Sequence, residues 1–187
     1  MHKVPQLAIV AAGLLAVGLM SWPTAAGATS ATAAITGGSL AFVSVPGSIG
    51  FTATLTGQDQ TVTATEPFNV GDATGSGTGW NITTTSTTFA TTSPVHTMSA
   101  SATTVQAAPT VACDSGATCT AATTAITYPY TVPAGSTAPT ATKIFDATAN
   151  TGMGDQTVTP TLSLAVPAST YAGSYSSTWT ISLVSGP

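Results

Sequence analysis

Charged side chains are nearly absent from this chain. They make up 4% of the 187 residues, arginine is missing, and the only lysines are Lys3 and Lys143. A typical soluble domain is about one quarter charged. Two lysines cannot neutralise a phosphate backbone, so the composition excludes nucleic acid as a partner.

Segments that could form a long helix are also missing. Glycine, proline and β-branched residues interrupt every candidate window, which disfavours helix throughout. The hydrophobic content of 43% is too high for a disordered chain. Threonine is abundant, favours strands, and keeps an exposed strand face hydrated through its hydroxyl. The composition therefore indicates an all-β protein whose solubility depends on hydroxyl groups.

The constellations that catalysis needs are absent as well. Beyond the N-terminal region the only histidine is His96, and the sequence contains no Gly-x-Ser-x-Gly elbow, phosphate loop or dinucleotide fingerprint. The acidic residues are scattered and lie mostly near turn-forming residues. Around Gly152 and Gly154, the acids Asp146 and Asp155 with Asn150 could offer oxygen ligands to calcium, but their spacing matches no EF-hand. We predict a protein that is not an enzyme and has no cofactor or metal.

The N-terminal 28 residues have the pattern of a signal peptide. Lys3 precedes an apolar run from Leu7 to Met20, and Ala26-Gly27-Ala28 forms an A-x-A cleavage pattern. An uncleaved membrane anchor is the alternative, although the run is shorter than the ~20 residues that span a bilayer. The sequence predicts a secreted, extracellular or cell-surface protein, with residues 1–28 removed and a flexible lead-in over 29–38.

The two cysteines fit an exported protein. Cys113 and Cys119 flank a turn-forming stretch, and such a close pair predicts a local disulfide. Two free thiols or half of a metal site are the alternatives.

From residue 39 to 187 the hydrophobic period is two, which predicts short strands. Apolar and polar residues alternate near residues 40–42, 49–55, 62–70, 80–84, 126–132, 162–166 and 175–183. Residues 85–125 are interpreted as a long excursion away from this pattern that carries short edge strands. Many short strands separated by turn signals are typical of an antiparallel sandwich. We predict an antiparallel Greek-key β-sandwich of the immunoglobulin-like type.

Two stretches share a Trp-x-Ile triplet. Residues 72–83 read DATGSGTGWNIT and residues 171–182 read YAGSYSSTWTIS, close to the C-terminus. Both resemble the paired motifs of the bacterial WxL domain family, with Ile in place of Leu. The resemblance implies an exported protein that binds the cell wall non-covalently, with peptidoglycan or another wall glycan as the ligand. It covers residues 39–187 in outline and the two stretches in detail.

The triplets allow two roles. Each tryptophan points to the same strand face as the isoleucine two residues later, so the pairs either pack in the core or stack on sugar rings. The ligand-binding candidates are Trp80, Asn81, Ile82, Trp179 and Ile181. Trp179 lies in a longer alternating face and is expected to be the core anchor. Trp80 follows a glycine-rich approach and is expected nearer the surface. Asn81 also begins a formal glycosylation sequon.

Function therefore has a leading and an alternative interpretation. The leading one is a non-catalytic cell-surface protein that binds wall glycan or takes part in adhesion. The alternative is a structural subunit that self-associates, or joins other surface proteins, in a pilus-like or matrix fibre. Low charge and strand edges without lysine suit edge-to-edge addition.

Overall fold

The computed structural model describes residues 29–187, so the predicted signal peptide lies outside the described residues. Residues 36–187 form one compact unit; residues 29–35 belong to another and are exposed throughout. Within the described part of the chain no helix is long and apolar enough to cross a membrane.

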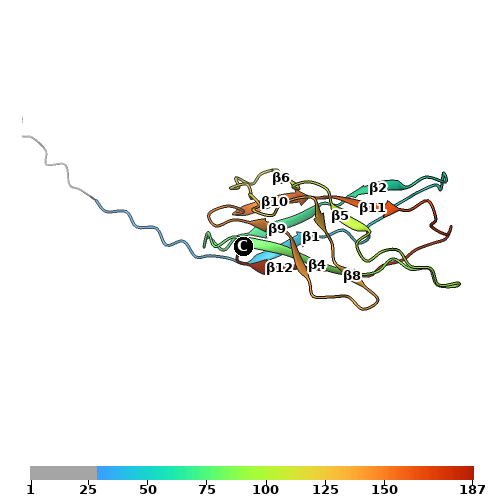
Figure 1. Cartoon of the computed structure of the whole chain (residues 1–187). Helices are drawn as coiled ribbons and strands as arrows, with labels where there is room; N and C mark the ends of the chain where they lie inside the picture. Colours follow the sequence, from blue (N-terminus) through green and yellow to red (C-terminus); the bar gives the residue numbers. More distant parts are fainter. Residues whose placement is uncertain (1–28) are drawn as a thin grey trace, which may run out of the picture. The chain divides into compact units, whose positions relative to one another are not determined.

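The predicted all-β sandwich is confirmed, and twelve strands build it (Figure 1). In chain order the strands are β1 (Leu40–Ser44), β2 (Gln60–Thr65), β3 (Phe68–Asp72), β4 (Trp80–Thr87), β5 (Thr103–Val105), β6 (Thr110–Cys113), β7 (Tyr130–Thr131), β8 (Ala134–Gly135), β9 (Thr142–Ala147), β10 (Gly154–Thr159), β11 (Thr161–Val166) and β12 (Trp179–Ser185).

The first layer consists of two sheets joined end to end. Their strand orders are β1-β3-β10-β6 and β2-β11-β5-β7. The chain passes from one sheet to the other at Pro67, Pro109 and Pro160. Because proline cannot donate a ladder hydrogen bond, three neighbouring strands break at the same level. A bond from the Glu66 amide to the Pro160 carbonyl (3.2 Å) spans the break.

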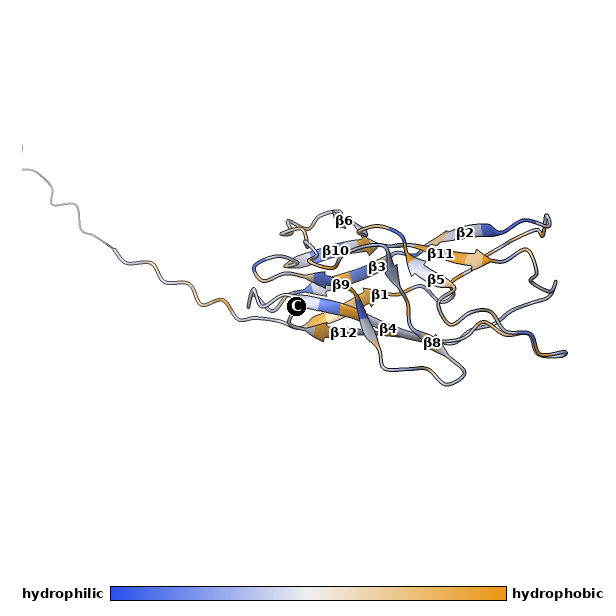
Figure 2. Cartoon of the chain, viewed as in Figure 1, coloured by the Kyte–Doolittle hydropathy of each residue, from blue (hydrophilic) through white to orange (hydrophobic). Residues whose placement is uncertain are grey.

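The second layer is smaller. Its central strand β4 pairs antiparallel with β12 and β9 and makes a short parallel pair with β8. The main core lies between this layer and β3, β10 and the adjoining ends of β5 and β11. Figure 2 shows apolar segments in orange on β1, β11 and β12. The second layer stops short of the outer half of β11, where irregular segments take over.

Several predicted elements differ from the structure. Residues 49–55 form no strand, and the segment 126–132 contributes only β7. The segment 146–155, in which Asp146, Asn150 and Asp155 were expected to share one loop, contains a shorter loop, because β9 and β10 extend into it from both sides. In the excursion 85–125, β6 is an edge strand as expected, but β5 lies inside its sheet.

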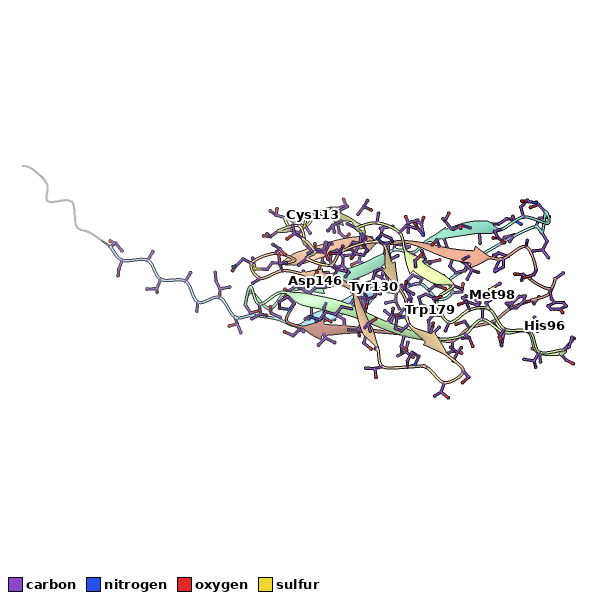
Figure 3. All side chains as sticks on the ribbon, in the orientation of Figure 1. His96, Met98, Cys113, Tyr130, Asp146 and Trp179 are labelled. Atoms are coloured by element: carbon purple, nitrogen blue, oxygen red, sulfur yellow. A yellow bond between two sulfur atoms is a disulfide. The ribbon has the colours of Figure 1, made fainter. Side chains whose placement is uncertain are left out.

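The predicted disulfide is confirmed. Cys113 and Cys119 are bonded, with Cα atoms 5.6 Å apart. The bridge joins the end of β6 to the following loop, at the edge of the first layer (Figure 3).

Candidate functional site

The two Trp-x-Ile triplets lie on neighbouring strands. β4 and β12 pair antiparallel, with Trp80 opposite Ser185 and Trp179 opposite Ser86. The two indoles therefore lie near opposite ends of the strand pair. This pairing brings the two motifs into one sheet but does not bring the tryptophans together into one binding surface.

The expectation that Trp80 lies nearer the surface is wrong. Its side chain is 0% exposed and its ring lies 5.7 Å from that of Phe145. Its indole Nε1 donates a hydrogen bond to the Gly152 carbonyl at 2.9 Å. The glycine-rich approach serves this packing: Gly79 has φ 77°, and a Cβ there would lie 2.2 Å from the Ala147 oxygen. Gly79 therefore permits the close approach of the backbone before Trp80 to the end of β9.

Trp179 is the less buried of the pair. It is half-buried and, with Ile181 and Leu183, packs against the edge of the main core. The alternating apolar face predicted for β12 is thus confirmed. The tryptophan that anchors the core, however, is Trp80 and not Trp179. Figure 3 places Trp179 on the ribbon of the second layer.

The other triplet candidates on β4 are interior. Ile82 is 0% exposed and Asn81 is 4% exposed, and Asn81 donates its side-chain amide to the Gly186 carbonyl at 2.6 Å. Neither side chain offers a surface to a ligand. The glycosylation sequon that begins at Asn81 is likewise buried in a paired strand. The side-chain amide of Asn81 instead holds the chain segment that follows β12.

The acid-containing turn between β9 and β10 does not assemble a cation site. Asp146 accepts bonds from the Thr124 hydroxyl (2.6 Å) and the Ala125 amide (2.9 Å), which fixes the neighbouring loop. Among residues 29–187, no group of three or more His, Cys, Asp or Glu side chains lies close enough to hold a metal.

The feature most suited to binding is an apolar cleft of about 550 Å³ beside the outer half of the β2-β11 pair. Three stretches wall it: Ile49–Leu55, the segment 170–175, and Phe89 with Met98. Its floor consists of Val62 from β2 with Leu164 and Val166 from β11, which belong to a second, smaller core cluster. The cleft exists because irregular chain, rather than a strand of the second layer, covers this part of the first layer.

Four aromatic residues are among those that line the cleft: Phe51, Phe89, Tyr171 and Tyr175. Phe51 and Phe89 meet edge to face with centroids 6.0 Å apart. Tyr171 is 64% exposed and stacks on His96 at 3.8 Å, with the ring planes 10° apart. The Tyr175 hydroxyl donates to the Tyr171 carbonyl at 2.9 Å. In Figure 3, Met98 and His96 lie toward the end of the domain away from Cys113.

Within residues 29–187, the side chains that line the cleft carry no formal charge. The described residues that line the cleft include no Asp, Glu, Lys, Arg or His, and its polar groups are the hydroxyls of Thr52, Thr170, Ser174 and the two tyrosines. Aromatic faces with a few hydroxyls suit a neutral ligand that has both apolar faces and hydrogen-bonding groups.

The sequence did not predict this site. Its residues come from stretches far apart in the chain, and the sequence suggested no binding role for Tyr171 or Tyr175. Their closeness to Phe51 depends on the fold. Comparisons of the chain with protein-family models, with curated proteins and with solved structures found no match.

Proposed function

We propose that this chain is a secreted, non-catalytic cell-surface protein that binds the uncharged sugar rings of a wall glycan, peptidoglycan or another wall polysaccharide, through the apolar cleft. The observation that carries the proposal is the uncharged, aromatic-lined cleft with the exposed Tyr171 ring at its margin. The faces of sugar rings are apolar and their rims carry hydroxyls, so stacking and hydroxyl contacts are available together. Two paired WxL-like motifs support the same interpretation.

Retention on insoluble peptidoglycan sacculi tests this proposal. Removing one stacking ring costs about 1 kcal/mol, so Tyr171→Ala should weaken retention by roughly five- to tenfold, whereas Tyr171→Phe should retain most of it. Val184→Ala is the matched control, since Val184 is also exposed but lies on β12 outside the cleft. Equal retention of Tyr171→Ala and wild type would remove the cleft from the proposal.

The alternative function as a fibre subunit has its own support. Four edge strands, β1, β2, β6 and β12, lack the charged residues that usually protect an edge against pairing, whereas the edge strand β9 carries Lys143 and Asp146. Sedimentation of the purified chain separates the two functions. Filaments that lengthen with concentration favour the fibre, and monomers that co-sediment with sacculi favour wall binding.

A further inference from the structure

One wall of the cleft is a segment that belongs to no sheet. Residues Ile49–Leu55, here called the strap, have the alternating pattern of a strand. Within residues 29–187, however, the strap makes no backbone–backbone hydrogen bond. Ile49 and Phe51 are half-buried against the core clusters, and the remaining strap residues are exposed. The strap is thus held by two apolar side chains rather than by a ladder.

Beside the strap, β2 has a free edge. Every residue of β2 is in register with β11 on one side, from Thr65 opposite Thr161 to Gln60 opposite Val166. On its other side the described chain supplies no paired strand, because β2 ends its sheet. The backbone groups on that edge are free to accept an incoming strand.

One hydrogen bond ties the strap to this edge. The Gln60 side chain donates to the Thr54 carbonyl at 2.9 Å. Because only residues 56–59 separate the strap from β2 and residue 54 lies beside residue 60, the chain turns back here and the strap runs antiparallel to β2. The Gln60 side chain thus occupies a strap carbonyl that a sheet would pair with backbone.

An inward movement of the strap would convert this arrangement into a hairpin. Leu55 would face Gln60 and Ala53 would face Val62, joined by the four-residue loop 56–59. Gly57 in that loop already has φ 80°, a left-handed conformation that glycine readily adopts in tight turns. A Cβ added at Gly50 would meet no atom within 4 Å, so close packing does not hold the strap at this point.

We propose that the strap closes over the apolar cleft. When a ligand fills the cleft, the strap pairs with the free edge of β2 as a hairpin strand and so encloses that ligand. A ligand can drive closure only by binding the closed state more tightly. Closure supplies that difference, because it brings the wall of the cleft against the ligand; the ladder hydrogen bonds that form at the same time offset part of the cost of ordering the strap. The identity of the ligand rests on the proposed function, whereas the movement of the strap is inferred from geometry alone.

Cysteine pairs test the register of closure. Thr52 and Thr63 are exposed and would be directly opposite in the hairpin, within the range that a disulfide spans. Thr52→Cys/Thr63→Cys should oxidise at least tenfold faster than the off-register pair Thr52→Cys/Thr65→Cys. Equal rates for the two pairs, or no cross-link in the opposed pair, would overturn the proposal.

The order of oxidation and binding tests the purpose of closure. Oxidising the opposed pair before sacculi are added should reduce retention at least tenfold, since the cleft is shut. Oxidising it after binding should slow release at least tenfold, and reduction should restore both to wild type. If the locked and reduced forms bind and release alike, the strap does not enclose the ligand.

The two proposals fail in different ways. If the wild-type chain is not retained by sacculi, the wall-binding function fails, while the cross-linking rates still decide whether the hairpin forms. If the wild type is retained and the opposed pair does not cross-link, only the closing strap is refuted.

Discussion

Replacing Trp80 by alanine tests which tryptophan anchors the core. The Trp80 ring is fully buried against Phe145, and its indole nitrogen is hydrogen-bonded to the Gly152 carbonyl. Truncating such a ring costs about 3–5 kcal/mol through lost burial and the cavity left behind. One kcal/mol shifts the melting temperature of a domain of this size by roughly 2–4 °C. For Trp80→Ala we therefore expect a fall of roughly 6–20 °C.

Two further variants divide this cost into its parts. Trp80→Phe keeps the ring packing but leaves the buried Gly152 carbonyl without its donor, so about 1–3 kcal/mol should be lost. Trp179→Ala removes a half-buried ring and should cost about half as much as Trp80→Ala, roughly 1.5–2.5 kcal/mol.

Urea and thermal unfolding of the purified variants measure all three. The m-value must stay constant for the comparison to hold, because a change in m would signal a different unfolded or native ensemble. If Trp179→Ala proves more destabilising than Trp80→Ala, the reasoning from burial is refuted.

Three more outcomes are expected. Gly152→Ala should destabilise the fold strongly, because its φ is 79° and the new Cβ would lie 2.6 Å from the indole nitrogen of Trp80; circular-dichroism melts check this. Alkylation without reduction should label neither Cys113 nor Cys119, and replacing both by serine should lower stability by about 2 kcal/mol or less while the fold persists. Burial raises the pKa of Glu66, so the folded state favours its protonated form; the resulting stability is present below the ordinary value of 4.5 and is lost as pH rises through the raised value. Glu66→Gln should therefore be more stable than wild type at pH 7 in urea titrations, and the difference should shrink as the pH falls toward 4.5. A constant difference across that range would contradict the assignment.

The strands most easily predicted from sequence were those with an apolar face and a hydroxyl face. β12 shows this most clearly, since Trp179, Ile181 and Leu183 face the core as their spacing requires. β9 and β10 were missed because their sequences, TKIFDA and GDQTVT, show no clear alternation of apolar and polar residues. In the structure, Gln156 on β10 is fully buried and its side chain accepts a bond from the Ala122 amide. A polar residue can fill an interior position when a distant backbone group satisfies it, and local periodicity does not reveal that.

The strap shows the opposite error. Its alternation from Ile49 to Leu55 is as regular as that of β12, yet it forms no ladder, and its Thr54 carbonyl is bonded by the Gln60 side chain instead of by backbone. Strand propensity was present, but pairing depends on what the neighbouring strand offers.

The sequence by itself determined the fold class, the local disulfide and the lack of charge, because each depends on composition or on residues near one another in the chain. Only the tertiary structure decided which tryptophan is buried and where the cleft lies. Trp80 is interior because Phe145 and Gly152, more than 60 positions away, close around it. The cleft forms because the second layer ends before β11 does, and the segments 49–55, 89–98 and 170–175 meet over the uncovered part. Both outcomes depend on contacts between distant segments, which periodicity along the chain does not encode.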